Sequence, residues 1–215
     1  MKFDIELHKR FKDNIIIDYG IIRGNNNILF IKTGQNGSKR GYKDKYLKIA
    51  KAINKKYGST VICSSNPFDG DNSLDDALEV IEKYVKDNSF NDYEIYYMGV
   101  SNGGFIGACF GDKYLKIKKM LLVNTPLMYN FYKIKQGLNN FKGQVVLIYG
   151  SLDQSTSYVK LLDQIENKNF KYVIIENQDH YFSKDTYDFQ NLPFEYLYND
   201  DRESSDIRWN IRYQF

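Results

Sequence analysis

The sequence predicts an α/β protein with a mostly parallel central sheet, helices on both faces of that sheet, and an antiparallel edge near the N-terminus. Strand-like and helix-like patterns alternate along most of the chain, and this alternation calls for a covered parallel sheet. The first two strand-like stretches follow each other through a short connection, as antiparallel neighbours do. The 215 residues are most simply one domain spanning 1–215.

Hydrophobic period and turn residues define the expected elements. We expect strands at residues 3–7, 15–22, 28–31, 59–63, 93–98, 119–123, 144–149 and 170–175. We expect helices at 43–57, from the Ser73–Asp76 capping box to about Val85, at 105–110 and at 158–165. Residues 24–27 read as a turn, and Gly58 ends the first helix.

Composition excludes several classes of function. A formal charge of +3 is modest for this length and does not indicate a nucleic-acid partner. No apolar run approaches the ~20 residues of a membrane span, and the N-terminus reads as a strand and not as a secretory signal. The two cysteines, Cys63 and Cys109, are too few for a disulfide scaffold or a zinc cluster. We therefore expect no metal, no cofactor and a cytoplasmic location.

The stretch YYMGVSNGGF, residues 96–105, places one serine between glycines where a strand gives way to a helix. A tight turn or a phosphate-binding loop would also use glycines. The stretch lacks the Gly-Lys-Ser/Thr ending of a P-loop, however, and is not a G-x-G-x-x-G motif. The pattern Gly99-x-Ser101-x-Gly103 between a strand and a helix is typical of a nucleophile elbow.

A serine hydroxyl becomes a nucleophile only when a base takes its proton. His180 follows the last expected strand at the carboxyl edge, where ligands bind in such sheets, whereas His8 is expected at the surface of the first strand. Asp153 follows the preceding strand and could orient the imidazole, although an N-cap aspartate would occupy the same position. Asp179 is the rival acid, but a residue adjacent to His180 usually points its side chain the other way.

The stretches YYMGVSNGG, LIYGSLD and ENQDHY resemble the nucleophile elbow, acid loop and histidine loop of the α/β-hydrolase family, and the resemblance spans nearly the whole chain. It implies that Ser101 is the nucleophile, that His180 is the general base and then acid, and that Asp153 is the orienting carboxylate. No cofactor is implied.

The resemblance also implies an oxyanion hole made of two main-chain N–H groups. One would be that of Asn102, directly after the nucleophile. The other would come from residues 33–37, where Gln35 is the best candidate. The chain departs from the family here, because Thr33 stands where His-Gly often occurs.

Residues 124–143 form a short cap-like connection at the place where many relatives insert a lid. This connection is too short for a cap domain, but it could bring Leu127 and Met128 beside the cleft, with Tyr181 as a further apolar wall. The alternative is the ordinary packing of a connecting helix.

These features together predict a serine hydrolase that cleaves a carboxylic ester or thioester of a small or exposed acyl group through an acyl-enzyme. Its partner would be a small-molecule or acylated substrate, and its oligomeric state stays open. Two alternatives remain: a non-catalytic binding or scaffold protein with the same fold, and a phosphate- or nucleotide-binding domain.

Overall fold

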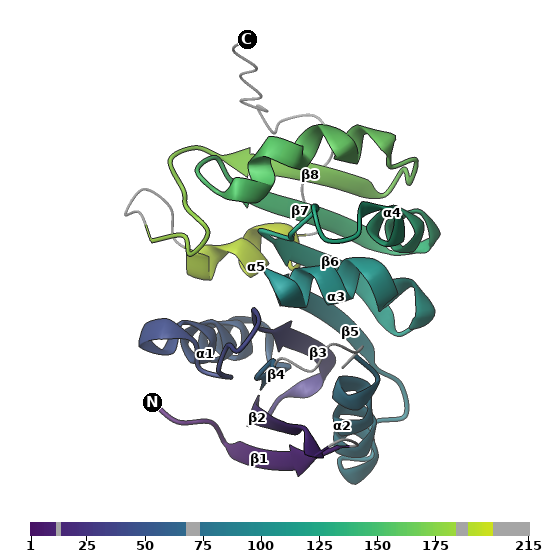
Figure 1. Cartoon of the computed structure of the whole chain (residues 1–215). Helices are drawn as coiled ribbons and strands as arrows, with labels where there is room; N and C mark the ends of the chain where they lie inside the picture. Colours follow the sequence, from purple (N-terminus) through teal and green to yellow (C-terminus); the bar gives the residue numbers. More distant parts are fainter. Residues whose placement is uncertain (12–13, 68–73, 184–188, 200–215) are drawn as a thin grey trace.

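The computed structural model describes residues 1–11, 14–67, 74–183 and 189–199 (Figure 1). Their strands form an eight-stranded sheet in the order β1-β2-β4-β3-β5-β6-β7-β8. The strands are β1 (Ile5–Arg10), β2 (Ile16–Ile22), β3 (Asn25–Lys32), β4 (Ser59–Ser64), β5 (Glu94–Val100), β6 (Ile117–Val123), β7 (Gln144–Gly150) and β8 (Phe170–Ile175). The helices are α1 (Lys45–Tyr57), α2 (Leu74–Asp87), α3 (Asn102–Phe110), α4 (Phe131–Asn140) and α5 (Leu192–Tyr196). Short 3₁₀ segments are η2 (Tyr42–Asp44), η3 (Gly111–Lys113), η4 (Gln154–Gln164) and η5 (Phe189–Asn191).

The antiparallel edge predicted near the N-terminus is confirmed. Strand β2 runs antiparallel to both of its neighbours, with Ile21 opposite Ile5 of β1 and opposite Ile62 of β4. Every other pairing in the sheet is parallel. The parallel part of the sheet therefore comprises β4, β3, β5, β6, β7 and β8, in that order.

Helices cover both faces of the sheet, as predicted (Figure 1). Alternate residues of one strand face opposite layers, because successive side chains point to opposite sides of a sheet. In β3, Ile31 packs in the cluster that holds α1 and α5, whereas Phe30 packs in the cluster that holds α2, α3 and α4. Both faces of the central strands are thus buried, which explains their near-continuous apolar runs.

Two expected elements differ in type from the observed ones, and others, such as the strand expected at residues 3–7 and observed as Ile5–Arg10, differ only in their bounds. The expected turn at residues 24–27 is mostly strand, because the Asn25 N–H donates to Gly58 O at 2.7 Å and Asn25 pairs with Ser59 before a register shift in the ladder. The helix expected at 158–165 is the 3₁₀ segment η4, which starts earlier, directly after Asp153. Ser73 of the expected capping box lies outside the described residues.

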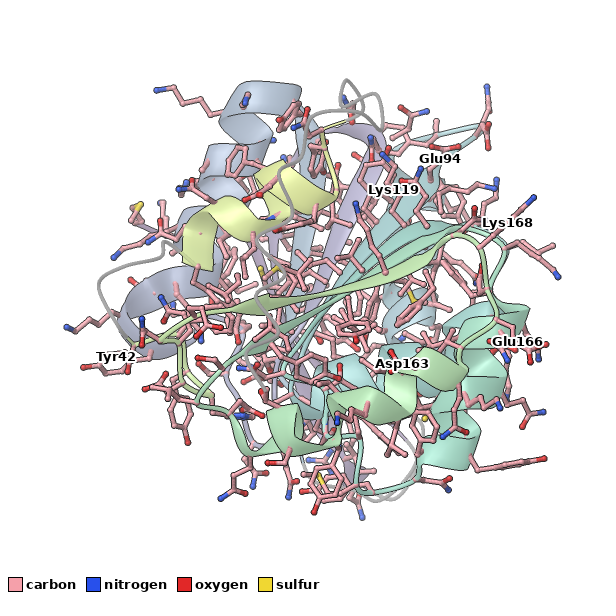
Figure 2. The ribbon with its side chains drawn as sticks, turned by 90° about the horizontal axis from the view of Figure 1, so that it is seen from above. Tyr42, Glu94, Lys119, Asp163, Glu166 and Lys168 are labelled. Carbon is pink, nitrogen blue, oxygen red and sulfur yellow. The ribbon has the colours of Figure 1, made fainter. Side chains whose placement is uncertain are left out.

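The parallel strands bring their carboxyl ends to one edge of the sheet. Figure 2 shows Tyr42, from the connection after β3, far from Glu94 and Lys119, which lie near the amino ends of β5 and β6. The connections that leave β3, β5, β6, β7 and β8 therefore meet at the carboxyl edge. Within the described ranges, no helix is both long and apolar enough to cross a bilayer.

Candidate active site

Ser101 occupies a strained position between β5 and α3. Its backbone has φ 52° and ψ −118°, a region that costs a residue with a side chain about 1–3 kcal/mol. Two main-chain hydrogen bonds hold it there: the Ser101 N–H donates to Val123 O at 2.7 Å, and Ser101 O accepts from the Phe105 N–H at 3.0 Å. The bonds of β6 and of α3 thus fix the turn at the carboxyl edge.

The two glycines of the elbow are required by close backbone approach. A Cβ atom on Gly99 would lie 2.5 Å from Gly103 O, and a Cβ on Gly103 would lie 2.3 Å from Lys32 O. The Tyr97 hydroxyl donates to Gly103 O at 2.6 Å, which ties the first turn of α3 to β5. The first turn of α3 therefore packs directly on the ends of β3 and β5.

The structure brings the three residues of the predicted triad into one chain of contacts. His180 Nε2 lies 3.1 Å from Ser101 Oγ. His180 Nδ1 lies within hydrogen-bond distance of Asp153 Oδ2. The Asp153 side chain is 2% exposed and the His180 side chain 40% exposed. A buried carboxylate thus contacts one imidazole nitrogen, and the other nitrogen faces the serine hydroxyl.

Asp153 makes both of the contacts that the sequence allowed, one as an N-cap and one with His180. Its Oδ1 accepts from the Ser155 N–H at 2.7 Å and caps η4, while its Oδ2 contacts His180. Burial raises the pKa of Asp153, but the hydrogen bonds from His180 and Ser155 outweigh it and hold the pKa below the usual value of 3.8. The carboxylate is therefore ionised at neutral pH.

The rival residues are engaged elsewhere. Asp179 Oδ1 accepts from the main-chain N–H groups of Tyr181 at 3.0 Å and of Ser183 at 2.9 Å, so its carboxylate folds its own loop. His8 Nδ1 on the edge strand β1 lies 2.6 Å from Asp18 Oδ1 on β2, in an exposed side-chain pair.

The loop expected to supply the second oxyanion donor lies against the elbow. A Cβ on Gly34 would lie 3.3 Å from Ser101 Cβ. Thr33 is buried, and its hydroxyl donates to Gly37 O at 3.1 Å, which closes the loop on itself. Among the described residues, no group accepts from the main-chain N–H of Asn102 or of Gln35. Both N–H groups therefore remain available at this edge.

Asn66 is a residue that sequence reasoning missed. Its Nδ2 donates to Thr33 O at 2.9 Å and to Asn102 Oδ1 at 3.0 Å, and its main chain pairs with Gly37. Its side chain thereby ties residues 33–37 to the elbow. No local motif marks Asn66, because the partners lie more than 25 residues away in either direction.

Solved structures that share the fold of this chain include esterases and a dienelactone hydrolase. No family model matches the sequence, and no curated protein matches it significantly. The esterase Pf2001 from Pyrococcus furiosus superposes with a TM-score of 0.64 at 16% identity, over 82% of this chain and 83% of that one. Est1E from Butyrivibrio proteoclasticus gives 0.61 at 16%, over 83% and 91%. Dienelactone hydrolase from Anabaena variabilis gives 0.61 at 12%, over 89% and 99%. The chain has the α/β-hydrolase fold.

The three residues expected to contact the substrate differ in how far they are exposed in this α/β-hydrolase fold. Leu127 is fully buried in the core, so it does not face solvent beside Ser101. Met128 is 40% exposed, and Tyr181 is 74% exposed with its ring centroid 5.3 Å from that of His180. The helix of the short connection, α4, packs against α3 as part of the helical layer. Residues 124–130 are thus the part that lies at the carboxyl edge.

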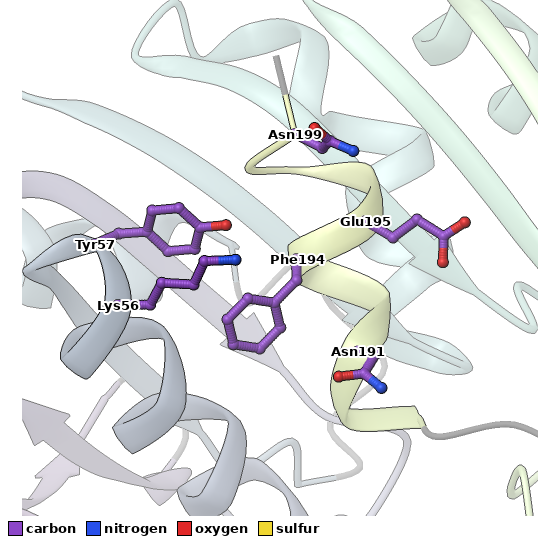
Figure 3. Close-up of a pocket in the computed structure, with 6 residues that line it drawn as sticks. All are labelled: Lys56, Tyr57, Asn191, Phe194, Glu195 and Asn199. Atoms are coloured by element: carbon purple, nitrogen blue, oxygen red, sulfur yellow. The ribbon is translucent and has the colours of Figure 1, made fainter. Parts of the chain in front are cut away.

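A surface hollow of about 370 Å³ lies elsewhere on the α/β-hydrolase fold (Figure 3). It is lined by Lys56, Tyr57, Asn191, Phe194, Glu195 and Asn199. The last turn of α1 contributes to it, and α1 runs back from the carboxyl edge to the start of β4. The hollow therefore lies at the amino edge, away from Ser101.

The two cysteines are not activated thiols. Both are buried and unpaired. Burial raises the pKa of the Cys109 thiol to about 12 and that of Cys63 still further. Neither forms a thiolate at neutral pH.

We predict that Gly103→Ala destabilises the protein. Alanine in a helix normally stabilises by about 0.5–1 kcal/mol relative to glycine. Here the new methyl group meets the Lys32 carbonyl, so we expect a loss of about 1–3 kcal/mol in the free energy of unfolding by urea denaturation. Gly111→Ala is the matched control, because its methyl group meets the tip of the flexible Met120 side chain. Equal stability of the two variants would contradict the close approach.

We predict that Asp153 contributes a pH-dependent part of the stability. Because its pKa is lowered on folding, this contribution is present above the unfolded pKa and is lost as pH falls through the folded pKa. The Tm difference between wild type and Asp153→Asn should therefore narrow below pH 3.8, as measured by thermal unfolding. A difference that is independent of pH would contradict the lowered pKa.

Proposed function

We propose that this protein is a serine hydrolase that cleaves a carboxylic ester or thioester through an acyl-enzyme. The observation that carries the proposal is the continuous chain of contacts from Ser101 Oγ through His180 to the buried Asp153. Supporting it, the serine is held in a strained elbow at the edge where α/β sheets bind ligands. The esterase and hydrolase structures that share the fold agree with this class of reaction.

The proposed reaction passes protons through His180. Its Nε2 takes the proton of Ser101 Oγ as that oxygen attacks the carbonyl carbon, and the imidazolium then gives this proton to the leaving alcohol or thiol. Water next attacks the acyl-serine while Nε2 accepts one of its protons. The imidazolium returns that proton to Ser101 Oγ as the carboxylic acid leaves. Asp153 stabilises the imidazolium and fixes the tautomer throughout.

The developing oxyanion would be held by main-chain N–H groups. Asn102 donates from the first turn of α3, where helix N–H groups have no intrahelical partner. Gln35 would donate from the loop that lies against Ser101. The side chain of Thr33 does not enter this role, because its hydroxyl closes the loop. A main-chain donor does not depend on side-chain identity, so the absence of His-Gly is compatible with the proposal.

The proposed substrate carries an apolar group near the scissile bond. Met128 and Tyr181 would contact this group. They belong to a set of exposed large apolar side chains on the connections that leave β6, β7 and β8. The set comprises Met128, Tyr129, Tyr132, Leu152, Tyr158 and Tyr181. A small or exposed acyl group fits an edge that is lined in this way and has only a short connection in place of a cap.

Labelling with a fluorophosphonate probe tests the nucleophile. Intact-mass measurement should find one adduct on wild type and none on Ser101→Ala. Hydrolysis of p-nitrophenyl acetate should fall by at least about 10³-fold in Ser101→Ala and in His180→Ala, because the members of a triad act as a unit.

Ser157→Ala, which removes an exposed serine of η4, is the matched control and should keep both the adduct and the turnover. A folded wild type that forms no adduct would contradict the proposal and favour a binding or scaffold protein. Stabilisation by a nucleotide that is unchanged in Ser101→Ala would favour a nucleotide-binding domain.

A further inference from the structure

Asn124 is a fully buried polar residue that the triad itself does not include. It follows directly after β6, which lies in the sheet between the strands that lead to Ser101 and to Asp153. Its backbone has φ 48°, in the left-handed region that asparagine adopts more readily than most residues. Its N–H donates to Ile148 O at 2.8 Å, which extends the β6–β7 ladder by one step.

The Asn124 side chain links the acid loop to the histidine loop. Its Oδ1 accepts from the Gly150 N–H at 3.0 Å, at the point where the chain leaves β7 toward Asp153. Its Nδ2 donates to His180 O at 2.9 Å and to Asp179 O at 3.3 Å. One amide thus uses its acceptor on the acid side and its donor on the base side.

Apart from the contact between Asp153 and His180, the hydrogen bonds described between the two loops involve residues 177 and 178 of the histidine loop. The Leu152 N–H donates to Gln178 O at 2.9 Å, and the Asn177 N–H donates to Ser151 Oγ at 2.9 Å. These bonds fix residues 177 and 178 to the acid loop. The carbonyls of residues 179 and 180 instead accept from Asn124 Nδ2, and the Asp179 carbonyl also accepts from the Phe182 N–H at 3.1 Å within its own loop. The Asn124 side chain thus links the end of β6 directly to the main chain of His180.

Three requirements specify asparagine at position 124. A donor is needed toward two carbonyls, an acceptor toward one N–H, and the backbone must tolerate positive φ. Aspartate would keep the acceptor but would turn a carboxylate oxygen toward the carbonyl of His180. Glycine would suit the backbone but would lose both side-chain groups.

We propose that Asn124 is a positioning residue that sets the distance between the His180 imidazole and the Asp153 carboxylate. The inference rests on the proposed hydrolase function. Its effect should appear in the chemical step and not in substrate binding, because Asn124 is fully buried and the hydrogen bonds described for its side chain go to main-chain groups. A displacement of about 1 Å in such a site can cost on the order of 10²-fold in rate.

The test compares Asn124→Gly and Asn124→Asp with wild type in p-nitrophenyl acetate hydrolysis, fluorophosphonate labelling rate and Tm. We expect kcat and the labelling rate to fall by about 10- to 10²-fold, with KM changed by less than about threefold. The low-field proton resonance of the imidazole N–H held by Asp153, assigned by its loss in His180→Ala, should weaken or disappear in both variants. Asn124→Gly provides the result if the added charge of Asn124→Asp prevents folding.

Asn167 provides the matched control at the opposite edge of the sheet. Its Nδ2 also donates to two carbonyls, Leu138 O at 2.7 Å and Phe141 O at 2.9 Å, and its Oδ1 accepts from the Asn169 N–H at 2.9 Å. Asn167→Gly and Asn167→Asp should lower Tm and leave kcat unchanged.

Asn124 variants that lose Tm as the Asn167 variants do, yet keep wild-type kcat and the low-field resonance, would overturn the positioning role. A rise in KM at constant kcat would also overturn it. A wild type that shows neither turnover nor labelling would instead contradict the proposed hydrolase function. The resonance, which requires no substrate, would still report on the position of His180.

Discussion

The close approach of the first turn of α3 to the ends of β3 and β5 is the constraint on which the rest of the carboxyl edge depends. No side chain fits at Gly99 or Gly103, where the backbones of the elbow and of β3 meet. This approach forces Ser101 into its strained conformation and brings it against Gly34. Ser101 and the loop after β3 are therefore positioned by the same contact, and a shift in one displaces the other.

Two buried asparagines stabilise this edge on either side of the elbow. The connections that follow the strands have main-chain N–H and C=O groups beyond the last hydrogen bonds of the sheet. Leaving such groups without a hydrogen-bond partner in the protein interior is costly. An amide side chain both donates and accepts, so it can join main-chain groups of two loops that do not bond to each other directly. Asn66 joins the loop after β3 to the elbow, and Asn124 joins the loops after β7 and β8.

Much of the fold and three residues of the site followed from local patterns. The alternation of strands and helices predicted the layers, and the elbow glycines marked Ser101. Leu127 was expected beside the cleft because of its place in the connection at residues 124–143, with ordinary packing as the alternative, and it lies in the core. An apolar residue in a short connection can face either way, and only the packing of its neighbours decides which. The 3₁₀ conformation of η4 could not be predicted either, because hydrophobic periodicity alone does not distinguish a 3₁₀ helix from an α-helix.

The sequence by itself determined which residue types could do chemistry and in what order they leave the sheet. It could not choose between the two roles of Asp153, and the tertiary structure assigns one carboxylate oxygen to each. Neither Asn66 nor Asn124 could be predicted, because their hydrogen-bond partners lie far away in the chain. Local sequence patterns reflect the backbone conformations that turns and strands require. Hydrogen bonds between distant loops depend on where the strands end, and only the assembled sheet decides that.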